Sequence, residues 1–374
     1  GTVFSVFIIG NVGKRSEKMK TIVINGLALG FAKNITGIQR AAHELIYRLD
    51  SLLESENLSV KYVYNVDNLN QVIVPERLKN IQPIPVKPDG KKMWKTRALR
   101  KIVKEEDAFL CCISLETAFL RNQISFIYDI RPVTTKFDTL KFRTKYRIYM
   151  LLQKINTQFI MTDSEYQKKA IAKYLHVSDS KITVLYMGYE HALNVEKDDG
   201  IFDKYPQLKN GGYYYTLGSL APHKNINWII EVARRNKDKL FVVAGGKDLR
   251  VWKDNVEVTG IDNLLFLGYV SDGENRSLME NCQAFIHPSK YEGFGIPPLE
   301  ALAYGAKIFI SNATCLPEIY EDCAVYFSPD DYEVDLDAMQ NQVVAAPDKI
   351  FAKCSWDKSA HQFLDILKNI AEHR

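Results

Sequence analysis

Two hydrophobic patterns alternate along the chain. Short runs rich in β-branched and aromatic residues, which are typical of buried strands, are separated by longer segments in which apolar residues recur every three or four positions, as in amphipathic helices. Segments 38–53 and 165–175 have the helical pattern, and the strand-like runs include "TIVING", "NLSVKYVY", "AFLCCIS", "ISFIYDI" and "TQFIMTDS". This alternation predicts a mostly parallel sheet covered by helices.

The alternation occurs twice. A polar, charged stretch at 194–210 interrupts it, and the strand-like runs then resume with "YYYTLGS", "LFVVAGG", "NLLFLGYV", "AFIHPS" and "KIFIS". A chain of 374 residues is also too long for one ordinary hydrophobic core. We therefore predict two doubly wound α/β domains, at 19–195 and 196–352, followed by an amphipathic helix within 353–374.

Residues 1–18 precede Met19, which is a natural place for translation to start. Their apolar stretch has no basic segment before it and no clear small-residue cleavage site after it, so it does not resemble a signal peptide. We expect these residues to be an upstream extension or a remnant of cloning. An additional edge strand is the alternative.

Composition argues against several classes of function. The formal net charge of +4 is small for this length, and no module of interleaved aromatic and basic residues supports a role with nucleic acid. The six cysteines are scattered without a Cys-x-x-Cys pair or a Cys/His cluster, which indicates reduced thiols in a cytoplasmic protein. The single Asp-x-Asp motif, at 335–337, lies in a polar stretch away from any core strand, so we expect no metal site.

One segment, 91–104, is strongly basic. Its sequence "KKMWKTRALRKIVK" holds seven basic residues and no acidic one, with Trp94, Leu99 and Ile102 on one helical face. Such a helix suits the surface of an anionic membrane, where a lipid-linked substrate would be found. An ordinary helix that covers the sheet is the alternative.

The most specific chemistry lies in "AFIHPSKYEGFGIPPLEALAYG", where a strand ends, a glycine-containing loop follows and a helix begins near a proline pair. Glycine lets a ligand approach the backbone closely. The free amides ahead of the helix, with the helix dipole behind them, suit an anion such as phosphate. These amides belong to Gly293, Phe294, Gly295 and Ile296.

Two glutamates flank this loop. A carboxylate in contact with phosphate would be repelled, so we expect Glu292 and Glu300 to accept hydrogen bonds from nearby sugar hydroxyls. The alternatives are that Glu300 merely complements the helix N-terminus and that Glu292 is a solvated loop residue.

Glu292 and Glu300, with seven residues between them in Glu-Gly-Phe-Gly-x-Pro-x-x-Glu, resemble the paired-glutamate signature of glycosyltransferase family 4. Members of this family are retaining enzymes of the GT-B fold. Further stretches are similar in the same order, namely "TGIQRAAHEL", "TDSEYQKKAIAKYL" with "ITVLYMGYE", "LGSLAPHKN" and "SWDKSAHQFL". The resemblance is dense over 212–330, and it implies two Rossmann-like domains that face a central cleft.

The resemblance also implies roles for single residues. In the family, the first glutamate contacts the donor sugar, the second binds the ribose and a lysine contacts the diphosphate; these positions are Glu292, Glu300 and Lys224. Gly37 resembles a glycine whose backbone approaches the diphosphate, and Tyr269 lies in a loop that contacts the base. A lysine at the diphosphate is also expected because the leaving group gains charge. A surface lysine that caps a turn is the alternative.

The chain departs from the family at two positions. Ser219 stands where many relatives have an arginine, so a protonated His223 or a residue from elsewhere would have to supply the second positive charge at the diphosphate. Tyr128 and Asp129 stand where many relatives have His-Asp; we expect Asp129 to contribute to catalysis, with a turn-capping role as the alternative. Arg40, one helical turn beyond "TG", is expected to reach the acceptor or a phosphate, unless it is a solvated helix residue.

Together these observations predict a retaining glycosyltransferase that uses a nucleotide-sugar and needs neither a cofactor nor a metal. It would transfer a hexose to a glycan or lipid-linked saccharide in the synthesis of cell-surface polysaccharide, in the cytoplasm or at the inner face of the membrane. The likeness of "GSLAPHKN" to mannosyl- and rhamnosyltransferases favours GDP-mannose as donor. A nucleotide-sugar epimerase of the same fold and a non-catalytic nucleotide-sugar-binding subunit are the alternatives.

Overall fold

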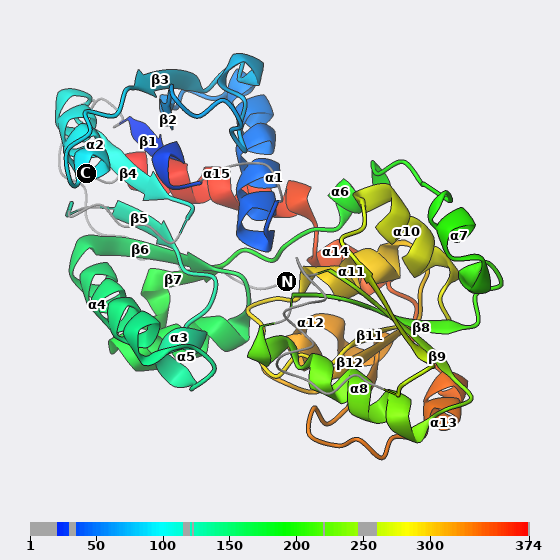
Figure 1. The fold of residues 1–374 in the computed structure, drawn as a ribbon. Coiled ribbons are helices and arrows are strands. Elements are labelled where there is room, and N and C mark those ends of the chain that lie inside the picture. The colour runs from blue at the N-terminus through cyan, green and yellow to red at the C-terminus, as the bar shows by residue number, and fades with distance from the viewer. Residues whose placement is uncertain are drawn as a thin grey trace.

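The computed structural model describes residues 21–29, 35–114, 120–121, 123–219, 221–245 and 260–372, and the extension expected at 1–18 lies outside these ranges. The described residues form two α/β domains, each built on a parallel sheet (Figure 1). The fold class predicted from the doubled pattern is confirmed.

The first domain contains a seven-stranded sheet of order β3-β2-β1-β4-β5-β6-β7, with every pairing parallel. Its strands are β1 (Ile22–Asn25), β2 (Val60–Asn65), β3 (Gln82–Val86), β4 (Phe109–Cys112), β5 (Gln123–Phe126), β6 (Thr157–Thr162) and β7 (Ile182–Val184). Its helices include α1 (Gly37–Leu52), α2 (Trp94–Glu105), α3 (Arg131–Thr134), α4 (Leu140–Asn156) and α5 (Glu165–Leu175).

The second domain contains a six-stranded parallel sheet of order β10-β9-β8-β11-β12-β13. Its strands are β8 (Tyr213–Leu217), β9 (Leu240–Ala244), β10 (Leu264–Gly268), β11 (Ala284–His287), β12 (Ile308–Ser311) and β13 (Val325–Phe327). Its helices include α8 (Ile226–Arg235), α10 (Asp272–Asn281), α11 (Ile296–Ala303), α12 (Leu316–Tyr320), α13 (Leu336–Asn341) and α14 (Asp348–Lys353).

Each sheet has one point at which the order of its strands reverses. This point lies between β1 and β4 in the first sheet and between β8 and β11 in the second. Ligands of open α/β sheets bind beyond the carboxyl ends of the strands at such a point. The loops that leave β8 and β11 carry Lys224 and Glu292, so the topology alone brings these two residues to one edge.

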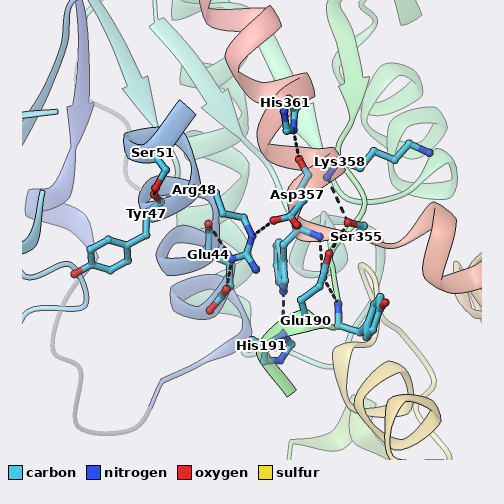
Figure 2. A network of polar contacts seen from close by, with 12 residues as sticks. Glu44, Tyr47, Arg48, Ser51, Glu190, His191, Ser355, Asp357, Lys358 and His361 are labelled. Carbon is cyan, nitrogen blue, oxygen red and sulfur yellow. Dashed lines mark hydrogen bonds and ion pairs between the residues drawn. The ribbon is translucent and has the colours of Figure 1, made fainter. Parts of the chain in front are cut away.

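The C-terminal helix α15 (Trp356–Glu372) crosses back to the first domain and packs against α1 (Figure 1). Figure 2 shows the polar contacts at this crossing. Asp357 accepts a hydrogen bond from Arg48 Nε at 2.6 Å, and Arg48 also pairs with Glu44 on the same helix. Ser355 donates to Glu190 at 2.5 Å, in the short connecting helix α6 (Glu190–Leu193). Helix α15 therefore connects the second domain, from which it continues, to helix α1 of the first domain.

Helix α2 places its apolar face on the first sheet. Leu99 is buried, and Trp94, Ile102 and Val103 pack against the core beneath it. The apolar residues of 91–104 are thus accounted for by an ordinary helix that covers a sheet. In the described part of the chain, no helix combines the length and the apolarity that a membrane span requires.

Candidate active site

A cavity of about 370 Å³ lies between the two domains and is lined by segments of both. Protein cavities of this size commonly hold small-molecule ligands. The predicted site residues that line it are Gly37, Arg40, Asp129, Lys224, Glu292, Gly293, Phe294, Gly295, Ile296 and Glu300. Residues far apart in sequence are therefore brought to one site.

The carboxylate of Glu292 lies in a buried network of charges. Lys224 Nζ donates to Glu292 Oε1 at 2.7 Å and to Oε2 at 3.0 Å, and His287 Nε2 lies 2.9 Å from Oε1. Glu292 and His287 are both buried. The alternative of a solvated loop residue is therefore wrong for Glu292.

The loop that carries Lys224 is held by the next residue. Asn225 adopts the left-handed conformation, with φ of 55°, which asparagine tolerates better than most residues. Its side-chain amide donates to the carbonyl oxygen of Pro288 at 3.0 Å and to that of Pro329 at 2.8 Å. The position of the lysine is thus fixed relative to the loop that carries Glu292.

Burial and neighbouring charges determine the protonation of Glu292 and His287. Burial alone would raise the pKa of Glu292, but the ammonium of Lys224 and the hydrogen bond from His287 outweigh burial and hold the pKa well below its usual range. Burial lowers the pKa of His287, although Glu292 opposes this change. At neutral pH the cavity therefore contains an ionised carboxylate, paired with Lys224 and beside a neutral imidazole.

Glu300 lies in the middle of α11, beyond its first turn, and is oriented by a histidine. Trp356 Nε1 donates to Nδ1 of His191 at 2.9 Å, so this ring nitrogen carries no proton. The proton of the neutral ring is then on Nε2, which lies 2.8 Å from Glu300 Oε1 and donates to it. The carboxylate of Glu300 is thus held by a hydrogen-bond chain that begins at α15.

The loop 293–296 packs tightly between the domains. A methyl group added to Gly293 would lie 2.5 Å from the carbonyl oxygen of Tyr128, in the first domain. Ser164, also in the first domain, donates to the carbonyl oxygen of Gly293 at 2.8 Å. Glycine is therefore required at 293 by contact between the domains, in addition to any approach of a ligand.

Among the described residues, no protein acceptor competes for the amides of loop 293–296. Gly295, with φ of 90°, precedes the first turn of α11, and its carbonyl accepts from the hydroxyl of Tyr320. Within the described part of the chain, the N–H groups of 293–296 donate to no protein acceptor. They remain available to an anion, as the sequence predicts.

The first domain contributes the N-terminus of α1. Thr36 caps this helix by accepting from the amide of Gln39, and Gly37 opens it. A methyl group on Gly37 would lie 3.7 Å from Ile296 Cδ1 of the second domain. One turn further, Arg40 reaches across to Asp272 on α10, with Nη2 3.3 Å from Oδ2. Arg40 is therefore not merely a solvated residue of the helix surface.

Two further carboxyl groups come from the ends of β5 and β6. Asp129 accepts from the amide of Arg131 at 3.0 Å, so it caps a turn and also lines the cavity. Burial raises the pKa of Asp129. Burial, Asp129 and other nearby carboxylates raise the pKa of Asp163 well above its usual range, and its Oδ1 has no hydrogen-bond partner among the described residues.

Comparison with known proteins identifies the family. Residues 198–334 match the profile of the family described as glycosyl transferases group 1. The chain is 31% identical over 258 residues to the O-antigen chain mannosyltransferase RfbU of Salmonella typhimurium, and the match covers 68% of this chain and 70% of that one. The chain belongs to the group 1 glycosyltransferases.

Other relatives agree with this assignment. The O-antigen chain mannosyltransferase B of Escherichia coli is 24% identical over 330 residues, which cover 80% of this glycosyltransferase and 84% of the relative. A glycosyltransferase of Rickettsia africae has a TM-score of 0.67 at 15% identity, covering 95% of this chain and 100% of that one. Anabaena HepE, solved with UDP and glucose, has a TM-score of 0.69 at 14% identity, covering 94% and 100%. The fold is the expected GT-B fold.

The structure places some predicted residues of this glycosyltransferase elsewhere. The exposed side chains of Ser219 and Tyr269 are not among the described residues that line the cavity. His223 cannot supply the missing positive charge at neutral pH, because burial, Arg131 and Lys224 lower its pKa to about 4. Arg131 Nη1 donates to the ring of this neutral histidine, 2.6 Å from Nε2.

Several polar residues of the site were not found from the sequence, among them His191, His287 and Asp163. His191 and His287 contact Glu300 and Glu292, respectively, and His191 and Asp163 also line the cavity. The only sequence signal for His287 and Asp163 is their position at the end of a strand, and no sequence signal marks His191.

In the described part of the chain, no group of three or more His, Cys, Asp or Glu side chains is arranged to hold a metal.

Proposed function

We propose that this glycosyltransferase is a retaining, metal-independent enzyme of family 4 that transfers mannose from GDP-mannose to a hydroxyl of a glycan or lipid-linked saccharide. The product would enter a cell-surface polysaccharide, and the enzyme would work in the cytoplasm or at the inner face of the membrane. Two relatives support the sugar and the product class, because both are named as O-antigen mannosyltransferases. Their activity also favours a transferase over an epimerase or a non-catalytic subunit.

One observation carries the proposal: the ion pair of Lys224 with the buried Glu292 shares an interdomain cavity with Glu300 and the free amides of 293–296. Amides and an ammonium suit a diphosphate, and fixed carboxylates suit hydroxyl groups. A nucleotide-sugar carries both kinds of group in one molecule. UDP bound to HepE is a nucleotide in a protein of the same fold.

The proposed reaction exchanges one bond at the sugar carbon. The bond from C1 of the sugar to the diphosphate oxygen breaks, and a bond from C1 to the acceptor oxygen forms on the same face. The departing diphosphate oxygen takes the acceptor proton, so no protein nucleophile is required. Lys224 and the loop amides would stabilise the charge of the diphosphate, and Glu292 would orient the sugar.

Arg40 is the best candidate for the second positive charge at the diphosphate. Among the described residues that line the cavity, Arg40 and Lys224 are the two permanent cations. Arg40 is paired with Asp272, an exposed residue that water can solvate when the arginine leaves. A side chain from the first domain would thus replace the arginine that many relatives have at position 219.

A donor screen followed by product analysis tests the proposal. A ligand that binds only the folded state raises its melting temperature, so GDP-mannose should raise it more than UDP- or dTDP-sugars at equal concentration. With an acceptor present, the new glycosidic bond should have the same anomeric configuration as the donor, as read by NMR. An inverted product, or an altered nucleotide-sugar formed without acceptor, would overturn the proposal.

A further inference from the structure

Helix α4 exposes large apolar side chains. Leu140, Ile148, Leu151 and Ile155 are 71%, 58%, 56% and 59% exposed, and Phe142 is exposed as well. With Thr144, the positions 140, 148, 151 and 155 follow the three-to-four-residue repeat of a helix, so they form one stripe. A contiguous exposed apolar patch of this kind marks a surface that binds something.

The same helix is strongly basic. Its seventeen residues include five lysines and arginines and no aspartate or glutamate. Lys141, Lys145, Arg147 and Lys154 are exposed beside the apolar stripe. We define the α4 surface as these four residues together with Leu140, Ile148, Leu151 and Ile155.

The inner face of α4 contacts the active site. Tyr146 is buried, and its hydroxyl donates to the carbonyl oxygen of Asp129 at 2.8 Å. Asp129 lines the interdomain cavity. A single helix, about 10 Å thick, therefore separates the α4 surface from a residue of the site.

We propose that the α4 surface docks on an anionic lipid membrane. The apolar stripe would enter the boundary between head groups and acyl chains, while the lysines and arginines contact anionic head groups. Contact with a second copy of the chain fits poorly, because symmetric pairing of α4 would place its five cations against five others without a compensating acid. A lipid surface offers acyl chains to the apolar residues and anionic head groups to the basic residues.

This surface replaces segment 91–104 as the site of membrane contact. Both helices are basic, but the apolar residues of α2 are packed on the sheet and those of α4 are exposed. Electrostatic attraction alone gives weak binding, whereas an inserted apolar face adds to it. The inference does not depend on the proposed donor or acceptor, since membrane binding can be measured without either.

Co-sedimentation of the full chain with vesicles tests the proposal. Wild type should bind vesicles that contain phosphatidylglycerol and bind those of phosphatidylcholine alone far less. Each basic residue near an anionic surface contributes roughly fivefold to partitioning, so Lys141→Glu/Lys145→Glu/Arg147→Glu should weaken binding by on the order of a hundredfold or more. Lys91→Glu/Lys92→Glu/Lys101→Glu changes the same net charge on the other basic segment and should retain most of the binding.

A tryptophan probe reports the depth of the α4 surface. With Leu151→Trp, vesicles of brominated phosphatidylglycerol should quench more fluorescence than they do with wild type. With Met93→Trp, which is exposed beside α2, no added quenching is expected. Thermal melts check that every variant folds. Loss of vesicle binding in the 91–101 variant with retention in the α4 variant would overturn the proposal, as would a wild type that binds no vesicles.

Discussion

At the scale of single residues, the account depends first on Lys224. A cation about 4 Å from a phosphate contributes about 4 kcal/mol at an effective dielectric constant near 20, and each 1.4 kcal/mol is roughly tenfold in rate. We expect Lys224→Ala to lower kcat/KM by on the order of a thousandfold in steady-state assays. Lys290→Ala is the matched control, since that ammonium pairs with exposed Asp330 outside the cavity, and its activity should be unchanged. Full activity of Lys224→Ala would contradict the assignment.

Asp163 gives a prediction about pH. Its pKa is raised in the folded state, so its favourable contribution to stability is present below the unfolded pKa of about 4 and is lost as pH rises through the folded value. Asparagine has nearly the same shape and no charge. We expect Asp163→Asn to raise the free energy of unfolding by about 1 to 3 kcal/mol at pH 8 and to change it little at pH 4.

Urea unfolding of wild type and Asp163→Asn at both pH values measures this difference. Asp198 is exposed and lies outside the cavity, so it serves as the control aspartate. Asp198→Asn should show no comparable gain at pH 8. A gain for Asp163→Asn that is equal at both pH values would mean that ionisation is not its cause.

At the scale of elements, His191 joins three helices. It lies on α6, accepts from Trp356 of α15 and donates to Glu300 of α11. If Glu300 binds the ribose equally in the ground state and in the transition state, its orientation affects KM and leaves kcat nearly constant. We expect His191→Ala to raise KM for the nucleotide-sugar roughly tenfold, the effect of about 1.4 kcal/mol.

His191→Gln distinguishes positioning from folding. Its amide can still donate to Glu300, so it should recover much of the affinity for the nucleotide-sugar. Initial rates over a range of donor concentrations measure both variants. A loss in kcat without a change in KM, or no recovery in His191→Gln although it folds, would contradict the positioning role.

Most elements could be predicted because their periodicity reflects which face is buried. The segment predicted at 38–53 is α1, Gly37–Leu52, and that at 165–175 is α5, Glu165–Leu175. Strand β3 was missed because its two prolines suppress the strand signal, which an edge strand tolerates. Helix α4 was missed because apolar residues on its exposed face obscure the repeat of its buried face.

Sequence could predict the part of the candidate site that lies within a single segment. The loop amides and both glutamates lie within nine residues, so spacing and residue type sufficed. The partners of those glutamates come from distant segments: Lys224 was found through its own motif, whereas His191 lies 109 positions from Glu300 and belongs to none. His223 was offered as a cation because sequence does not report burial beside Arg131.

At the scale of the whole molecule, contact between the domains sets the shape of the cleft. A Cβ atom at position 293 would lie 2.5 Å from the carbonyl oxygen of Tyr128. This backbone atom cannot move away by a change of rotamer, as a side chain can. We expect Gly293→Ala to separate the domains and to increase the radius of gyration measured by small-angle X-ray scattering. Gly37→Ala, which meets only ordinary contact at 3.7 Å, should leave the radius unchanged. Equal radii for all three proteins would contradict this view of the cleft.

The central claim is that the cavity between the domains holds a nucleoside diphosphate. A crystal structure of the protein with bound GDP or UDP tests it most directly. We expect the diphosphate against the amides of 293–296, with Lys224 Nζ in contact with a phosphate oxygen and Glu300 bonded to the ribose hydroxyls. A nucleotide bound outside this cavity, or one that contacts neither side chain, would contradict the account.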